Sequence, residues 1–155
     1  MDLQRSDPVK IAIRRITVER IIDLRHAMLR QGLPREAAVF AGDEADTAIH
    51  LSAFAGETVV GCLTLHLNEW QGEPAWQLRG MACRGDWQKR GVGRRLVEEA
   101  ERLVLAGVGP RLMWCNARVP AIGFYCKMGW DVVSEEFEIP TAGPHVKMSR
   151  RLLPV

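Results

Sequence analysis

A short basic stretch rich in glycine is the part of this sequence whose residue types and spacing point most directly to chemistry. It lies between an apolar segment, residues 76–83, and a strongly amphipathic segment with helical periodicity. Glycines let a chain turn tightly, and the first N–H groups of a helix have no partners within the helix and attract anions. Two interpretations follow, a pyrophosphate-binding loop or a glycine turn before an exposed basic helix. The stretch reads Gln88-Lys89-Arg90-Gly91-Val92-Gly93-Arg94.

Cysteine and histidine residues are too scattered to form a metal site. The four cysteines contain no Cys-x-x-Cys pair, and the four histidines show no ligand spacing among themselves or with the cysteines. We therefore expect reduced thiols and no metal cofactor. The residues concerned are Cys62, Cys83, Cys115, Cys126, His26, His50, His66 and His145.

Length and composition indicate one ordinary domain spanning residues 1–155, with a polar, flexible N-terminus over residues 1–9. Hydrophobic residues make up 47% of the chain and charged residues 26%, and the net charge is only +2. A pI near 8.5 is too mild to favour nucleic-acid binding. No apolar run approaches the roughly 18 residues of a membrane span, and no signal peptide is evident, so we expect a cytoplasmic protein without a membrane partner.

Alternating apolar residues predict most of the strands. The third and fourth predicted strands follow hairpin loops at residues 56–58 and 68–74, which gives an antiparallel meander. A closing pair turns around Pro140 and Gly143. The predicted strands span residues 10–16, 49–55, 59–67, 75–83, 112–115, 130–139 and 145–152.

Apolar residues spaced three and four positions apart predict three helices. The first has Thr17 as its N-cap and ends at Gly32, the second runs from Gly91 to Gly107, and the third begins near Pro120. The second helix links two strands in the manner of a parallel crossover. The fold class is therefore α/β (α+β), with a central strand, turn, helix and strand unit.

The segment over residues 31–47 has no sustained period. It contains Pro34 and Gly42 and the acids Asp43, Glu44 and Asp46. It is either a loop or irregular helix beside a site or a plain surface loop. Its acids are expected to be solvated, although they could attract a cationic amine.

Two motifs together resemble those of the GNAT superfamily of acyl-CoA-dependent N-acyltransferases. Gln88 to Gly93 is similar to the family's Gln/Arg-x-x-Gly-x-Gly/Ala signature, and residues 124–130, Phe-Tyr-Cys-Lys-Met-Gly-Trp, are similar to its later Phe-Tyr-x-Lys-x-Gly-Phe-like segment. Residues 78–83 match the preceding strand, and the order of elements matches over nearly the whole chain. The resemblance implies a mixed, mostly antiparallel sheet of about six to seven strands with flanking helices.

The resemblance also implies where acetyl-CoA binds. Backbone groups of Met81, Ala82 and Cys83 would pair with the pantetheine arm as with an added strand. The N–H groups of Gln88, Lys89, Arg90, Gly91, Val92, Gly93 and Arg94 would hold the pyrophosphate. Asn116 would face the same cleft, or it is simply a turn residue at a strand end.

Tyr125 is the only tyrosine in the chain and occupies the position of a family tyrosine near the thioester sulfur. A phenol of pKa about 10 gives its proton to a thiolate of pKa about 8.5 at a cost of roughly 2 kcal/mol in water, so hydrogen bonding serves as well as full transfer. The resemblance therefore implies that Tyr125 is catalytic. The alternative is a core aromatic residue on one helix face with Phe124 and Met128.

The general base has no clear candidate. Many relatives carry a glutamate on the strand before the glycine turn, whereas this chain has Gln77 and Arg79 there. Candidates near the acceptor are His50, His66 and His145, or a water chain without a single responsible residue.

The predicted activity is acetyl transfer from acetyl-CoA to a primary amine of a small molecule or protein, by direct attack in a ternary complex. A non-catalytic acyl-CoA sensor is the alternative, and the missing glutamate favours it slightly. A P-loop protein is not supported, because Gly-x-x-x-x-Gly-Lys-Ser/Thr is absent. The C-terminal strands leave a homodimer possible.

Overall fold

A computed structural model of the chain describes residues 10–153, so the flexible terminus expected at residues 1–9 lies outside the described residues. The strands and α-helices are, in order, β1 (Ile11–Ile16), α1 (Ile22–Leu29), β2 (Ile49–Ala55), β3 (Thr58–Trp70), β4 (Glu73–Cys83), α2 (Val92–Ala106), β5 (Leu112–Arg118), α3 (Ile122–Lys127), β6 (Asp131–Val132), β7 (Phe137–Ile139) and β8 (Gly143–Arg151). Single 3-10 turns lie at Val18–Arg20, Arg35–Ala38, Gly85–Trp87 and Val119–Ala121.

The strands form one mixed sheet in the order β1-β2-β3-β4-β5-β8-β6, and β7 also pairs with β8. Every pairing is antiparallel except that of β4 with β5. The predicted mixed, mostly antiparallel fold is therefore confirmed, as is the parallel crossover through α2. The sheet has eight strands among the described residues rather than six to seven, because the strand predicted over residues 130–139 is broken into β6 and β7.

A serine side chain explains this break. The Ser134 hydroxyl accepts a hydrogen bond from the Lys147 N–H at 2.7 Å, where a regular ladder would offer a backbone carbonyl. The pairing shifts accordingly, from Val132 opposite Met148 to Phe137 opposite His145. The alternation of apolar and polar residues could not predict this irregularity, because it depends on a hydrogen bond to a single hydroxyl group.

Two local predictions were wrong. Thr17 is the N-cap residue of the 3-10 turn Val18–Arg20 rather than of α1, its side chain makes no capping hydrogen bond, and α1 begins only at Ile22. The loop predicted over residues 68–74 is a tight two-residue turn, because Gln71 and Gly72 both adopt positive φ angles of 51° and 80° between Trp70 and its partner Glu73. Such a turn matches the twist of the flanking strands, which therefore extend further than their alternation indicated.

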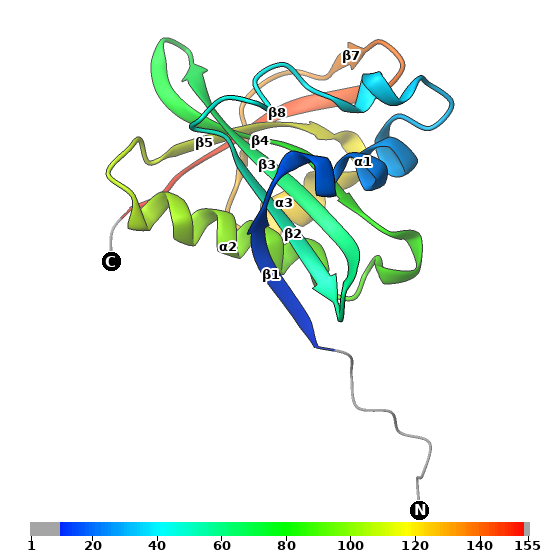
Figure 1. Cartoon of the computed structure of the whole chain (residues 1–155). Helices are drawn as coiled ribbons and strands as arrows, with labels where there is room; N and C mark the ends of the chain where they lie inside the picture. Colours follow the sequence, from blue (N-terminus) through cyan, green and yellow to red (C-terminus); the bar gives the residue numbers. More distant parts are fainter. Residues whose placement is uncertain (1–9, 154–155) are drawn as a thin grey trace, which may run out of the picture.

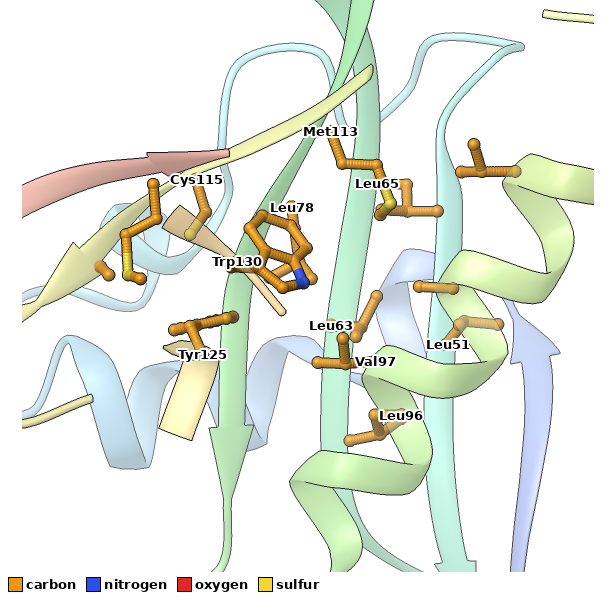
Figure 2. Packing of buried hydrophobic residues seen from close by; sticks show 14 of the residues in the cluster. Leu51, Leu63, Leu65, Leu78, Leu96, Val97, Met113, Cys115, Tyr125 and Trp130 are labelled. Carbon is orange, nitrogen blue, oxygen red and sulfur yellow. The ribbon is translucent and has the colours of Figure 1, made fainter. Parts of the chain in front are cut away.

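Helices cover both faces of the sheet (Figure 1). On one face, α2 buries the apolar stripe that includes Leu96 and Val97 against Leu51 and Leu63 of the strands, as Figure 2 shows. On the other face, α1 and its preceding turn form a smaller cluster with Cys62 and other residues. The main core continues to Tyr125, Trp130 and Cys115, so one end of it borders the site described next.

Candidate active site

The parallel strands β4 and β5 separate after a short contact, and this opens the site. They pair only at Trp76 with Met113 and at Gln77 with Trp114. Beyond that point β4 continues to Cys83 and β5 to Arg118 without further pairing between the two in the described sheet. Unpaired backbone groups on a strand edge can bind an extended ligand that carries amides.

A β-bulge shifts the register of β4 against β3 inside this opening. Pairing with β3 shifts by one residue between Thr64 opposite Arg79 and Cys62 opposite Ala82. Gly80 adopts φ +64°, and a Cβ there would lie 2.9 Å from Arg25 Nε and 3.0 Å from Phe40 Cε2. Glycine is required both for the angle and for the space. The next residue, Met81, lies at the boundary between two cavities.

The first cavity, of about 780 Å³, lies at the N-terminus of α2. Gly91 is the N-cap with φ 84°, and the first helical bond runs from Arg95 N–H to its carbonyl at 3.1 Å. The free N–H groups of this turn suit an anion. Lys89 and Lys127 also line the cavity, whereas its two arginines, Arg94 and Arg150, pair with Glu98 and Glu101. Of the predicted contact residues, Met81, Cys83, Gln88, Lys89, Gly91, Val92, Gly93 and Arg94 line this cavity.

Three predicted contact residues are not part of the lining of this cavity. Ala82 is buried in the cluster beneath α1, so any contact it makes with a ligand goes through its backbone. The Arg90 guanidinium stacks on Trp87, 4.0 Å from the ring centroid. Asn116 lies within β5, opposite Lys147, so the alternative of a turn residue at a strand end was wrong. It lines the second cavity, and its side-chain oxygen accepts a hydrogen bond from Lys147 Nζ at 2.9 Å.

The second cavity, of about 500 Å³, lies on the opposite side of the β4 bulge from the α2 turn. Its walls come from the end of α1, the segment after it, β4, the end of β5 and the loop between β7 and β8. Tyr125 lines this cavity, and Met81 lines both. The buried phenol therefore shares the second cavity with Met81, the residue that lines both cavities.

Tyr125 is only 4% exposed and packs between Phe124 and Trp130, with ring centroids 5.1 and 5.3 Å away. Burial raises the pKa of Tyr125 well above its ordinary value, and the neighbouring Cys115 thiol adds to this effect. The phenol therefore stays protonated at neutral pH and is available as a hydrogen-bond donor. Figure 2 shows its ring at the edge of the core, close to Cys115 and Trp130.

The three candidate histidines lie in different surroundings. His50 is buried, with Nδ1 2.8 Å from Thr64 Oγ1 and Nε2 2.9 Å from the Asp43 carbonyl, so both ring nitrogens have partners. His66 Nδ1 lies 3.0 Å from Arg79 Nη2, and burial together with that cation lowers the pKa of His66. Neither histidine lines the two cavities.

His145 is the candidate that lines the second cavity together with Tyr125. Its Nδ1 lies 2.8 Å from the Gly143 carbonyl, which can only accept, so Nδ1 carries the hydrogen. In the neutral ring Nε2 is then an acceptor. His145 is 4% exposed and lies beside the Phe137 ring.

Sequence reasoning missed a buried ion pair beneath this site. Asp43, which was expected to be a solvated loop acid, is only 4% exposed and pairs with the fully buried Arg25 at 2.7 Å. Arg25 also donates to Thr64 Oγ1 at 2.6 Å and to the Ala38 carbonyl at 3.0 Å. The expectation was wrong because the partner lies on another element, where local polarity gives no signal.

The described residues contain no group of three or more side chains that could hold a metal ion. No helix in that part of the chain is long and apolar enough to cross a membrane.

Comparison with known proteins gives consistent matches over most of the chain. The sequence model of the acetyltransferase (GNAT) family matches residues 18–130. A Bacillus subtilis (strain 168) relative, named as the uncharacterized N-acetyltransferase YitI, is 32% identical over 92% of this chain and 97% of its own length.

Solved structures share the fold at lower identity. Escherichia coli ElaA superposes with a TM-score of 0.77 at 17% identity, over 92% of this chain and 100% of its own. An aminoglycoside 6'-N-acetyltransferase complexed with coenzyme A superposes with a TM-score of 0.73 at 15% identity, over 93% of this chain and 98% of its own.

Proposed function

This chain belongs to the GNAT family of acetyltransferases and uses acetyl-CoA as its co-substrate, and we propose that a primary amine attacks the thioester directly at the junction of the two cavities. The observation that carries the proposal is the position of Met81 on the walls of both cavities, with Tyr125 beside it in the second. Acetyl-CoA enters from the side of α2, and the amine enters from the side of α1.

In the proposed complex the pyrophosphate lies on the turn from Gln88 to Arg94. Lys89 and Gly91 are left-handed, with φ angles of 61° and 84°, and both line the first cavity. Successive N–H groups in such a turn form a concave site that suits an anion. Gln88 Nε2 donates to the Cys83 carbonyl at 3.2 Å and ties this turn to the end of β4. The pantetheine arm then lies along Met81 to Cys83, at the edge that β5 leaves unpaired.

In the proposed reaction, the amine nitrogen bonds to the acetyl carbonyl carbon, and the carbon–sulfur bond then breaks. The electron pair leaves on sulfur, and the Tyr125 hydroxyl donates a hydrogen bond there, because its raised pKa makes full proton transfer to the thiolate unfavourable. The proton that the amine loses passes to His145 Nε2 or to water. The side chain of Gln77, where relatives carry a glutamate, accepts a hydrogen bond from Asn68 at 2.8 Å and supplies no base.

Three of the four cysteines support direct attack rather than an acyl-enzyme. Burial raises the pKa of the Cys62 and Cys115 thiols to about 12, so neither is a nucleophile at neutral pH. Burial also raises the pKa of Cys83, which lines the first cavity.

The remaining expectations belong to the same proposal. The chain acts as one domain over residues 1–155, without a nucleic-acid or membrane partner. A cytoplasmic location is supported by the free state of all four cysteines. A homodimer would form at a sheet edge, where β6 and β7 each pair only with β8 among the described strands.

A paired binding and turnover experiment tests the function. Calorimetry measures acetyl-CoA binding, and a thiol-release assay follows free CoA over a panel of amines. The proposal predicts binding together with CoA release that depends on an amine. Binding without release above the background rate would instead support the acyl-CoA sensor, for which the relatives, named as N-acetyltransferases, give no support.

A further inference from the structure

The cavity proposed for the acceptor has a strongly one-sided charge. Three arginines line it, Arg30 from the end of α1, Arg79 from β4 and Arg118 from the end of β5, and its described lining contains no aspartate or glutamate. This arrangement is opposite to the one that a polyamine or an aminoglycoside would need. The charge comes from elements far apart in the sequence, so it is a property of the fold.

One carboxylate, that of Asp43, lies close behind this lining, and it is already paired with an arginine. Asp43 forms its bidentate pair with Arg25, and its Oδ1 lies 3.8 Å from Arg79 Nη2. A single negative charge therefore serves two guanidinium groups. Arg79 is held further by the Ala41 carbonyl and by His66, which fixes it as part of the wall.

Arg30 and Arg118 have no comparable compensation. Each is half-buried, and within residues 10–153 no carboxylate lies within 4 Å of either guanidinium. Arg30 donates only to the Leu29 carbonyl at 2.9 Å and lies 5.1 Å from the Phe40 ring. Burial lowers the pKa of Arg30, and the nearby charges of Arg118 and Arg25 lower it further. Arg30 and Arg118 both line the second cavity, whereas Arg25 is buried behind it. An arginine nonetheless stays charged at neutral pH.

Neighbouring cations without a partner are relieved by a bound anion, and a guanidinium fork matches the oxygens of a carboxylate or a phosphate. We infer that the acceptor is a small primary amine that also carries a carboxylate or a phosphate group, held by Arg30 and Arg118. This inference rests on the proposed function, since it assigns the acceptor to this cavity. A volume of about 500 Å³ fits a metabolite of that size.

The same positive charges also lower the pKa of the bound amine. Nearby cations disfavour an ammonium ion and favour the neutral, nucleophilic form. The arginine cluster therefore does part of the work that a glutamate base does in relatives. It explains how a strand that carries Gln77 and Arg79 instead of an acid still serves an acetyltransferase site.

The test compares amines that differ only in the anionic group. Amino acids are assayed beside their carboxamides and their decarboxylated amines, and phosphoethanolamine beside ethanolamine, with acetyl-CoA at saturation. We expect kcat/KM to be about 10- to 100-fold higher for the anionic member of the preferred pair. The amino acid comparison and the phosphoethanolamine comparison show whether the preferred anionic group is a carboxylate or a phosphate. An equal or higher kcat/KM for the neutral or cationic members overturns the inference and leaves the acetyltransferase function intact.

Substitution localises the effect. Arg118→Gln and Arg30→Gln are expected to raise KM for the anionic amine about 10-fold or more while KM for acetyl-CoA stays unchanged. The matched control is Arg35→Gln, because Arg35 is an exposed arginine paired with Asp23 outside the cavity. If a glutamine variant fails to fold, Arg118→Lys keeps the charge, loses the bidentate fork and should still weaken binding. Unchanged KM values in the folded variants would contradict the assignment.

A binding measurement separates the two possible failures. The acetylated products of the acids and of their carboxamides are titrated into the CoA-bound enzyme, and their affinities are compared. About a 10-fold preference for the acids supports the inference without relying on turnover. Equal affinities overturn it. Absence of CoA release with every amine, although acetyl-CoA binds, would remove the proposed function and this inference together.

Discussion

The Arg25 guanidinium donates two hydrogen bonds to the Asp43 carboxylate in a buried bidentate pair, with Nη1–Oδ2 at 2.7 Å and Nη2–Oδ1 at 3.1 Å. The pair joins α1 to the segment after it, and the Phe40 N–H also donates to the Asp43 carboxylate at 2.8 Å. Phe40 in turn covers Arg25, with the guanidinium carbon 4.2 Å from the ring centroid. One wall of the acceptor cavity therefore depends on an ion pair that touches no substrate.

Removal of the carboxylate should destabilise the whole fold. Asp43→Ala leaves the fully buried Arg25 without its counter-ion, and such a loss costs about 3–5 kcal/mol. Urea denaturation measures the free energy of unfolding. Asp23→Ala is the control, because it breaks an exposed Arg–Asp pair and should change stability little. Equal effects of the two substitutions would show that the buried pair is not structural.

The same pair predicts a loss of stability in acid. Burial alone would raise the pKa of Asp43, but hydrogen bonds from Arg25 and from the Phe40 N–H outweigh it, so the pKa lies below its ordinary value. The stabilisation is therefore complete above the unfolded-state pKa of about 4 and is lost as pH falls towards the folded-state value. Wild type should lose more stability than Asp43→Asn between about pH 5 and pH 2. Parallel curves would contradict this account.

Tyr125→Phe should separate chemistry from packing. The phenylalanine ring keeps the contacts with Phe124 and Trp130, so stability should change by no more than about 1 kcal/mol. Without the hydroxyl the leaving sulfur loses its donor, and kcat should fall roughly 10²-fold with KM for acetyl-CoA almost unchanged. Steady-state kinetics and thermal denaturation provide the two readouts. An unchanged kcat would contradict the catalytic role and show that Tyr125 only packs in the core.

Gly93→Ala should move stability and binding in opposite directions. Gly93 lies in the first turn of α2, and a Cβ there would meet only Phe124 at 3.5 Å and Met81 at 3.9 Å, which are ordinary contacts. Alanine in place of a helical glycine should stabilise the fold by up to about 1 kcal/mol. The same methyl group would protrude into the cavity proposed for acetyl-CoA and weaken its binding.

Gly123→Ala is the matched control for this substitution. Gly123 is also helical, has open space around its Cβ position and lines neither cavity. It should gain stability without any change in acetyl-CoA affinity, as measured by calorimetry. Unaltered affinity in Gly93→Ala would argue against the proposed position of the co-substrate.

Much of the fold follows from local patterns in the sequence. The period of α2, the glycines before it and the start of the apolar strand after it required only residues close together in the chain, and each was predicted correctly. That strand, β5, continues to Arg118 rather than ending at Cys115. Breaks that depend on single side chains were not predictable in this way. The Ser134 hydroxyl splits the strand predicted over residues 130–139, and positive φ angles at Gln71 and Gly72 tighten a hairpin.

The acceptor side of the site was less predictable than the acetyl-CoA side. The residues of the glycine turn are contiguous in the sequence, so their common role could be predicted from a local motif. Arg30 at the end of α1 and Arg118 at the end of β5 line one cavity although they lie far apart in the sequence, and Asp43 is neutralised by Arg25 from another element. Charges that gather through long-range packing leave no local pattern in the chain.

The central claim is direct acetyl transfer between substrates that occupy the two cavities together, and initial-velocity kinetics with both substrates varied test it most directly. With an amine that supports CoA release, double-reciprocal plots should intersect, the product amine should carry the acetyl group, and mass spectrometry should find no acetylated enzyme. Parallel lines with an acetyl group on a cysteine such as Cys83 would contradict the claim, because they would place an acyl-enzyme between the two half-reactions.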